Sequence, residues 1–327
     1  MANFTGLAAA RHEVLRRTGY DVEADGLHGA PPLRVIVGEE VHVSVLAALR
    51  YLGIGATQVK RIDVDAQGRL RPEKLDAALA AGNGPTIVCA QAGNVNTGAF
   101  DPFEAIVDLA HGHGAWVHVD GAFGLWAAAS QSLRHHVAGA GRADSWAADG
   151  HKWLNVPYDS GFVFTAHPAA HRAAMSFSAA YLTRSGGEPR EAMDWTPESS
   201  RRGRAFAVYA ALRSLGRSGV ADMVERCCRL ARRFAERLSA EPSIRILNDV
   251  VLNQVLVRVE PLGTDGDEAT RVALKRVQDE GVCWLGGTRW HGFDAIRISV
   301  SNWSTTELDV DRSADSIIRA ARARNVQ

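Results

Sequence analysis

Cysteine is scarce in this chain of 327 residues, and its positions exclude two classes of site. The thiols are too few and too scattered for a disulfide framework or a CxxC metal knuckle, so we expect reduced thiols and a cytoplasmic protein. No apolar run reaches the ~18 to 20 residues that cross a bilayer, and the first segment lacks the pattern of a signal peptide. We therefore expect no membrane association. The four cysteines are Cys89, Cys227, Cys228 and Cys283.

An excess of charge of either sign is also lacking. The 37 Lys and Arg residues equal the 37 Asp and Glu residues, so no positive field attracts a phosphate backbone, and we expect no nucleic-acid partner. Hydrophobic residues make up 46% and charged residues 23%, which is typical of a globular protein with a sizeable core. The length exceeds one ordinary core. We predict a large domain over residues 1–215 and a small one over residues 216–327.

Short β-branched runs alternate with amphipathic segments in the first half of the chain. Helices are predicted over 4–17, 42–53 and 102–114, and strands at 33–38, 85–93, 115–120, 144–149 and 160–166. This alternation predicts βαβ units and a mostly parallel sheet, which places a ligand at the carboxyl ends of the strands.

The second half of the chain has a different pattern. Two long amphipathic segments, 201–216 and 220–240, precede the order strand, helix, strand, strand. This order is typical of a small α+β domain. The residues STTE at Ser304–Glu307 predict a capping box at the start of a final helix.

Asp120 and Lys152 are conspicuous because each lies next to an apolar segment, where an unpartnered charge is costly. Asp120 ends the predicted strand AWVHV, and Lys152 lies in DSWAADGHKW, just after the next predicted strand. The carboxyl ends of neighbouring parallel strands meet at one edge of a sheet, so the two side chains should lie close together. By themselves they fit a plain ion pair as well as a catalytic site.

Blocks around these two charges resemble the group II pyridoxal-phosphate-dependent decarboxylases, which act on aromatic amino acids, glutamate or diaminobutyrate. Similar blocks follow the family order along nearly the whole chain: VHVSVLAALRYLG, GNVNTGAFDP, HVDGAFG, DGHKWLNVPYDSG, AAYL, ESSRRGRAFAVYAALRSLG and IRISVSNW. The resemblance implies an α/β fold like that of aspartate aminotransferase (fold type I), with a small C-terminal α+β domain. It also implies the cofactor pyridoxal 5'-phosphate, an amino-acid substrate and a homodimer.

The resemblance assigns three residues to the cofactor ring. Lys152 would form a Schiff base with the cofactor aldehyde, as a lysine in a shielded pocket can. Asp120 would pair with the pyridinium nitrogen and keep the ring protonated, so that the ring can draw electrons from the substrate. Ala122 would pack against one ring face, where a larger side chain would displace the ring.

Four further residues come to the cofactor through the resemblance. His42 would stack on the opposite ring face, although a histidine before a helix is also a common cap or surface residue. His151 and Asp149 would help to hold the phosphate. Asn94 would lie near the ring hydroxyl or the substrate, and it equally fits a turn asparagine.

The remaining candidates concern the substrate. Tyr181 lies in a glycine-containing stretch without periodicity, predicted as a mobile loop, and in the family a tyrosine there protonates the substrate carbon. Arg297 resembles the small-domain arginine that meets the substrate carboxylate in some members. Arg201 and Arg202 are interpreted as structural.

A metal-dependent hydrolase is a competing hypothesis. His111 and His113 form an HxH pair, and His118, Asp120 and His151 could complete a metal site. However, an HxH that binds metal in a barrel enzyme lies at the end of a strand, whereas AHGHGAW has glycines where a helix should end. We therefore prefer the cofactor site.

The first residues raise a further alternative. Family members carry a phosphate-binding loop rich in Ser, Thr and Gly just before a segment like ANFTGLAAAR, and this chain begins inside that region. The resemblance therefore leaves two expectations. One is a carboxy-lyase that converts an L-amino acid to its amine and carbon dioxide. The other is a shortened remnant without activity, which binds the cofactor weakly or binds only a partner.

Overall fold

The structure is a computed structural model that describes residues 1–177 and 191–323. Its larger sheet has the order β2-β1-β3-β4-β5-β6, in which β6 alone runs antiparallel to its neighbour. The prediction of a mostly parallel α/β domain is therefore confirmed. The strands are β1 (Arg34–Gly38), β2 (Val59–Ile62), β3 (Thr86–Gln91), β4 (Trp116–Asp120), β5 (Ser145–Asp149) and β6 (Gly161–Thr165).

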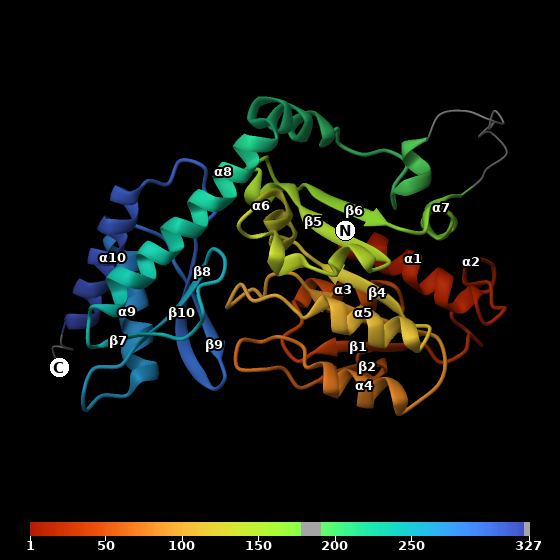
Figure 1. Cartoon of the computed structure of the whole chain (residues 1–327), viewed down its shortest axis with the longest axis horizontal. Helices are drawn as coiled ribbons and strands as arrows, with labels where there is room; N and C mark the ends of the chain where they lie inside the picture. The colour runs from red at the N-terminus through yellow and green to blue at the C-terminus, as the bar shows by residue number, and fades with distance from the viewer. Residues whose placement is uncertain (178–190, 324–327) are drawn as a thin grey trace.

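Helices cover both faces of this sheet, as Figure 1 shows, and the central strands β3 and β4 are buried on both faces for that reason. Along β1, Val35 and Val37 pack with residues of α1 and α3, whereas Ile36 packs with residues of α4 and α5. The helices of this part are α1 (Ala2–Arg16), α2 (Val22–Asp25), α3 (Val43–Tyr51), α4 (Pro72–Ala80), α5 (Phe103–Gly112), α6 (Gly150–Trp153) and α7 (Pro168–Met175). Short 3-10 turns are Ala56–Gln58, Gly124–Ala129, Arg134–Val137, Ala140–Arg142 and Ala192–Trp195.

The smaller sheet has the order β7-β8-β10-β9 and is antiparallel throughout. It confirms the predicted C-terminal α+β unit. Helices α9 and α10 pack against each other, and α9 packs on β8 and β10. The elements are β7 (Ile244–Ile246), β8 (Gln254–Val259), α9 (Gly266–Glu280), β9 (Gly286–Trp290), β10 (Phe293–Ser299) and α10 (Glu307–Arg322).

A long helix, α8 (Ala205–Ser239), connects the two sheets (Figure 1). Gly216 interrupts it with φ 61° and ψ −176°, a conformation that suits a residue without a side chain. The domain boundary after residue 215 stays a prediction, which this break supports.

One local prediction is wrong. The capping box of the last helix is formed by Thr306 and Asp309, two residues after the predicted pair, because α10 begins at Glu307. Among the described residues, no helix is long and apolar enough to cross a membrane.

Candidate active site

A cavity of about 690 Å³ opens at the carboxyl ends of β4 and β5, next to the smaller sheet. Residues far apart in the sequence line it because β4 and β5 are parallel neighbours and the turn after β5 returns toward them. Seven of the predicted site residues line this cavity: His42, Asp120, Ala122, Asp149, His151, Lys152 and Arg297.

Asp120, the last residue of β4, is buried at this cavity. Its Oδ1 accepts a hydrogen bond from the backbone N–H of Ala122 at 3.2 Å, and its Oδ2 accepts one from Asn3 Nδ2 at 3.1 Å. No basic side chain of the described residues forms an ion pair with it within 4.0 Å. Burial raises the pKa of the Asp120 carboxyl, which His42 and Lys152 oppose by their charge. A cationic N–H group in the cavity would stabilise this carboxylate.

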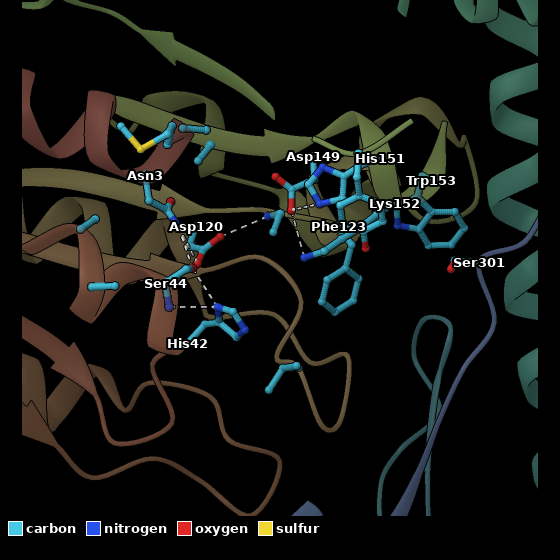
Figure 2. Close-up of a pocket in the computed structure, with 18 of the residues that line it drawn as sticks. Asn3, His42, Ser44, Asp120, Phe123, Asp149, His151, Lys152, Trp153 and Ser301 are labelled. Carbon is cyan, nitrogen blue, oxygen red and sulfur yellow. Dashed lines mark hydrogen bonds and ion pairs between the residues drawn. The ribbon is translucent and has the colours of Figure 1, made fainter. Parts of the chain in front are cut away.

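Lys152 comes from α6, directly after β5. Its Nζ lies 3.1 Å from Asp149 Oδ2 and 5.6 Å from the ring centre of Phe123 (Figure 2). A third of the lysine side chain is exposed, so it is less shielded than expected from the sequence. The turn is tight at Gly150, where a Cβ atom would lie 2.9 Å from Ser160 Oγ.

His42 is the N-cap of α3. Its Nδ1 accepts hydrogen bonds from the backbone N–H of Ser44 at 3.2 Å and from the Ser44 hydroxyl at 2.7 Å. When the ring is neutral, its proton therefore lies on Nε2. Burial lowers the pKa of His42, so the neutral form is favoured.

His151 and Asp149 form the other side of the lysine turn. The His151 Nδ1 atom lies 2.6 Å from the carbonyl oxygen of Ser160, to which it donates. Its Nε2 lies 3.5 Å from Asp149 Oδ2. Asp149 thus contacts both the lysine and the imidazole with one oxygen.

Arg297 reaches the cavity from β10 of the smaller sheet. Its Nη1 donates to the backbone carbonyl of Val95 at 3.3 Å and to Ser299 Oγ at 3.4 Å. Within the described part of the chain, no carboxylate forms an ion pair with it. Burial lowers the pKa of this guanidinium. Its position therefore favours an anionic ligand.

The four other residues singled out in the sequence lie away from the cavity or outside the described residues. Asn94 is not part of the cavity wall. Its Nδ2 donates to Glu40 at 3.0 Å and its Oδ1 accepts from two backbone N–H groups of the following turn, as a turn asparagine would. Tyr181 lies outside the described residues. Arg202 donates to the backbone carbonyl of Tyr158 at 2.7 Å, and Arg201 pairs with Glu198 at 3.0 Å.

The three other histidines of the metal hypothesis do not line the cavity that Asp120 and His151 share, so the five residues do not form one metal site. His111 pairs with Asp144 at 3.0 Å, and His113 lies 3.9 Å from Asp76. His118 is fully buried within β4, where it contacts Asn3 of α1. Among the described residues, no group of three or more His, Cys, Asp or Glu side chains could hold a metal ion.

Sequence reasoning missed Asn3, Ser44 and Phe123, all of which line the cavity. Asn3 is buried and contacts Asp120 directly. The one available signal was its place as a polar residue in an otherwise apolar helical turn, which does not identify its partners.

The residues around Asp120 and Lys152 fit the ring of pyridoxal 5'-phosphate. Asp120 is a buried carboxylate without a cationic partner within ion-pair distance among the described residues, which suits a protonated ring nitrogen. Lys152 would supply an amine for the aldehyde, and Ala122 and His42, which line the same cavity, would supply a small and a planar surface for the ring.

Known proteins were compared with this chain. The model for the pyridoxal-dependent decarboxylase conserved domain matches residues 1–260. An acidic amino acid decarboxylase of Bos taurus is 31% identical over 69% of this chain and 45% of its own length. A 4-hydroxyphenylacetaldehyde synthase of Rhodiola rosea is 28% identical over 93% of this chain and 62% of its own. This chain thus spans less than two thirds of either relative.

A solved structure is similar over nearly the whole chain. The crystal structure of Oryza sativa TDC with PLP and tryptamine superposes with a TM-score of 0.90 at 26% identity, covering 98% of this chain and 68% of that one.

Proposed function

Because the chain belongs to the pyridoxal-dependent decarboxylase family, we propose that it removes the α-carboxylate of an L-amino acid with the help of pyridoxal 5'-phosphate. Its fold is fold type I, as predicted. The observation that carries the proposal is the pair Asp120 and Lys152, which line one cavity from the ends of neighbouring parallel strands. The products would be carbon dioxide and the corresponding amine.

When bound, pyridoxal 5'-phosphate supplies a ring that accepts the electron pair left behind as carbon dioxide departs. Asp120 would hold the proton on the ring nitrogen, since its buried carboxylate gains a cationic partner there. Lys152 Nζ would hold the aldehyde, and Asp149, 3.1 Å away, can take the proton that this amine must lose to act as a nucleophile. Ala122 and His42 would hold the two ring faces.

Further residues would bind the cofactor phosphate and the substrate. We place His151 at the phosphate, because its ring lies beside the lysine turn and is fixed by Ser160. Arg297 would bind a substrate carboxylate, since among the described residues it has no acidic partner within ion-pair distance. Tyr181 would return a proton to the substrate carbon, a role that rests on the family resemblance. Asn94 is not proposed as a cofactor ligand.

We also propose a homodimer that works in the cytoplasm. Aromatic side chains at the start of α8 support the dimer: Phe206 is 83% exposed and Tyr209 is 67% exposed. Such side chains are enriched where two proteins meet. Light scattering on the purified chain tests the dimer, and a monomer at micromolar concentration would contradict it.

The proposed activity is tested by a panel of L-amino acids, aromatic and acidic ones included, incubated with the chain and pyridoxal 5'-phosphate. We expect carbon dioxide and an amine from at least one of them, and neither product from the Lys152→Ala variant. The same assay should measure aldehyde. In Tyr181→Phe we expect the cofactor to stay bound while amine formation is lost, with dioxygen and water consumed instead and an aldehyde, carbon dioxide, ammonia and hydrogen peroxide released. Absence of carbon dioxide with every amino acid would overturn the proposal.

A further inference from the structure

Asn3, in the first turn of α1, joins three side chains that the family resemblance did not connect. Its Nδ2 donates to Asp120 Oδ2 at 3.1 Å and to Ser44 Oγ at 3.1 Å. Its Oδ1 accepts from His118 Nε2 at 3.0 Å. A carboxylate can only accept hydrogen bonds, so the amide group that faces Asp120 must be the NH₂. The orientation of the Asn3 side chain is therefore fixed by its partners.

The hydrogen bonds behind Asn3 all run in one direction. Trp116 Nε1 donates to Ser145 Oγ at 2.9 Å, and Ser145 Oγ donates to His118 Nδ1 at 2.8 Å. The Asp120 end sets the direction: a carboxylate can only accept, so Asn3 turns its NH₂ to Asp120, and its Oδ1 must accept from Nε2–H of a neutral His118, which leaves Nδ1 to accept from Ser145. Every proton between Trp116 and Asp120 then has one position.

This single arrangement of donors and acceptors requires that the His118 ring carries one proton, so that one ring nitrogen donates and the other accepts. It is fully buried and has no carboxylate within ion-pair distance among the described residues. Burial lowers its pKa to about 3, so the ring is neutral at physiological pH. With Nδ1 accepting from Ser145, the single proton lies on Nε2 and points to Asn3.

A second branch leads from Asn3 to the ring of His42. Ser44 Oγ accepts from Asn3 and donates to His42 Nδ1 at 2.7 Å, which leaves the His42 proton on Nε2. Figure 2 shows Asn3, Asp120, Ser44 and His42 beside one another along the cavity wall. The two groups expected at the cofactor ring thus share one hydrogen-bond donor.

The backbone of α1 is close enough for these contacts because residue 6 is glycine. A Cβ atom at Gly6 would lie 2.8 Å from His118 Cε1, closer than real Cβ contacts. Gly6 lies one turn after Asn3, so both residues face His118.

We propose that Asn3 is a positioning residue, which orients the Asp120 carboxylate directly and the His42 ring through Ser44, so that both meet pyridoxal 5'-phosphate in a single arrangement. The cofactor part of this inference rests on the proposed function. The proton positions on the two histidines are properties of the chain alone, so they can be tested without cofactor.

The test uses Asn3→Leu, which removes both donors at similar volume, and Ser44→Ala, which breaks only the His42 branch. Thr5→Val is the matched control, because Thr5 is buried in the same turn and its hydroxyl, within the described part of the chain, bonds only to the carbonyl of the N-cap residue Met1. Circular dichroism establishes which variants are folded.

The first measurement is nitrogen NMR of the histidine rings without cofactor. We expect one tautomer, protonated at Nε2, for His42 and His118 in the parent chain and in Thr5→Val. Asn3→Leu should give mixed tautomers at His118, whose Nε2 loses the Asn3 oxygen. Ser44→Ala should keep the His42 tautomer, because the backbone N–H of residue 44 still donates to Nδ1, but it should shift the Nδ1 resonance, since the hydroxyl donor is lost. An unchanged His118 tautomer in a folded Asn3→Leu, or an unchanged His42 Nδ1 resonance in Ser44→Ala, would overturn the proposal, so the proposal stays testable if Asn3→Leu does not fold.

The second measurement is a titration with pyridoxal 5'-phosphate followed by visible absorption. Loss of a hydrogen bond to a buried carboxylate should raise the dissociation constant roughly tenfold or more in Asn3→Leu relative to Thr5→Val. Equal dissociation constants overturn the cofactor part. If even the parent chain binds no cofactor, the proposed function fails, and the tautomer measurement alone decides the role of Asn3.

Discussion

Asp149 and Lys152 lie on the same turn between β5 and α6, with 3.1 Å between the carboxylate Oδ2 and the amine Nζ. This ion pair holds the lysine side chain at the cavity, beside the ring of Phe123. The amine therefore lies at the cavity wall, where an aldehyde bound in the cavity could react with it.

We predict that Lys152 is the lysine that binds pyridoxal 5'-phosphate. Borohydride reduction followed by peptide mass mapping should place the pyridoxyl group on the peptide with Lys152. Lys74→Ala is the matched control, since Lys74 is paired with Asp63 on the surface, outside the cavity wall. Lys152→Ala should lose the reducible adduct and Lys74→Ala should keep it. A pyridoxyl group on another lysine would contradict the assignment.

A second prediction concerns Arg297, which has no acidic partner within ion-pair distance among the described residues. Arg297→Gln should raise KM for an amino-acid substrate by roughly ten- to a hundredfold, because a charge-assisted hydrogen bond to the carboxylate is lost. Cofactor affinity should stay within about twofold. Arg289→Gln serves as control, since Arg289 lies on the adjacent strand and pairs with Asp294 at 2.9 Å. Steady-state kinetics and a cofactor titration measure both effects, and an unchanged KM in Arg297→Gln would refute the role.

A third prediction follows from the lowered pKa of His118. Unfolding raises that pKa from about 3 to about 6.5, so between these values the unfolded chain binds a proton that the folded chain does not. The free energy of unfolding should therefore fall as the pH is lowered below 6.5, by up to about 1.4 kcal/mol per pH unit from this group. NMR should show no titration of the folded His118 ring between pH 8 and 5, and titration of the same ring in urea. A folded ring that titrates in this range would contradict the prediction.

Gly124 gives a prediction about stability. A Cβ atom there would lie 2.2 Å from the backbone oxygen of Ala92, so Gly124→Ala must displace the turn after β4 from the end of β3. We expect a loss of about 1–3 kcal/mol in the free energy of unfolding. Gly112→Ala is the control, because a Cβ at this last residue of α5 meets nothing within 4 Å. It should gain up to about 1 kcal/mol. Urea denaturation measures both, and equal effects would refute the steric argument.

The parallel sheet could be predicted because its central strands are apolar on both faces. β2 was missed because Lys60 and Arg61 are exposed on this edge strand and break the apolar pattern. Asp120 and Lys152 could be found because each follows a predicted strand, and strand ends meet at one edge.

Asn3 could not be found in the same way. Its partners Asp120 and Ser44 lie 117 and 41 residues away in the sequence, and a single asparagine in a helical turn has no spacing that indicates them. The sequence also could not predict whether Asn94 faces the cavity. Its hydrogen bonds with the next turn and with Glu40 depend on the path of a loop.

The two sheets contribute separately to the cavity. Asp120 and Lys152 come from the larger sheet, whereas Gln254, Arg297 and Ser299 come from β8 and β10. Substitutions in β8 and β10 can therefore alter what the cavity recognises without moving Asp120 and Lys152. Related proteins can therefore differ in substrate while they catalyse the same type of reaction. Directed evolution for a new substrate should begin at the inward-facing positions of these two strands.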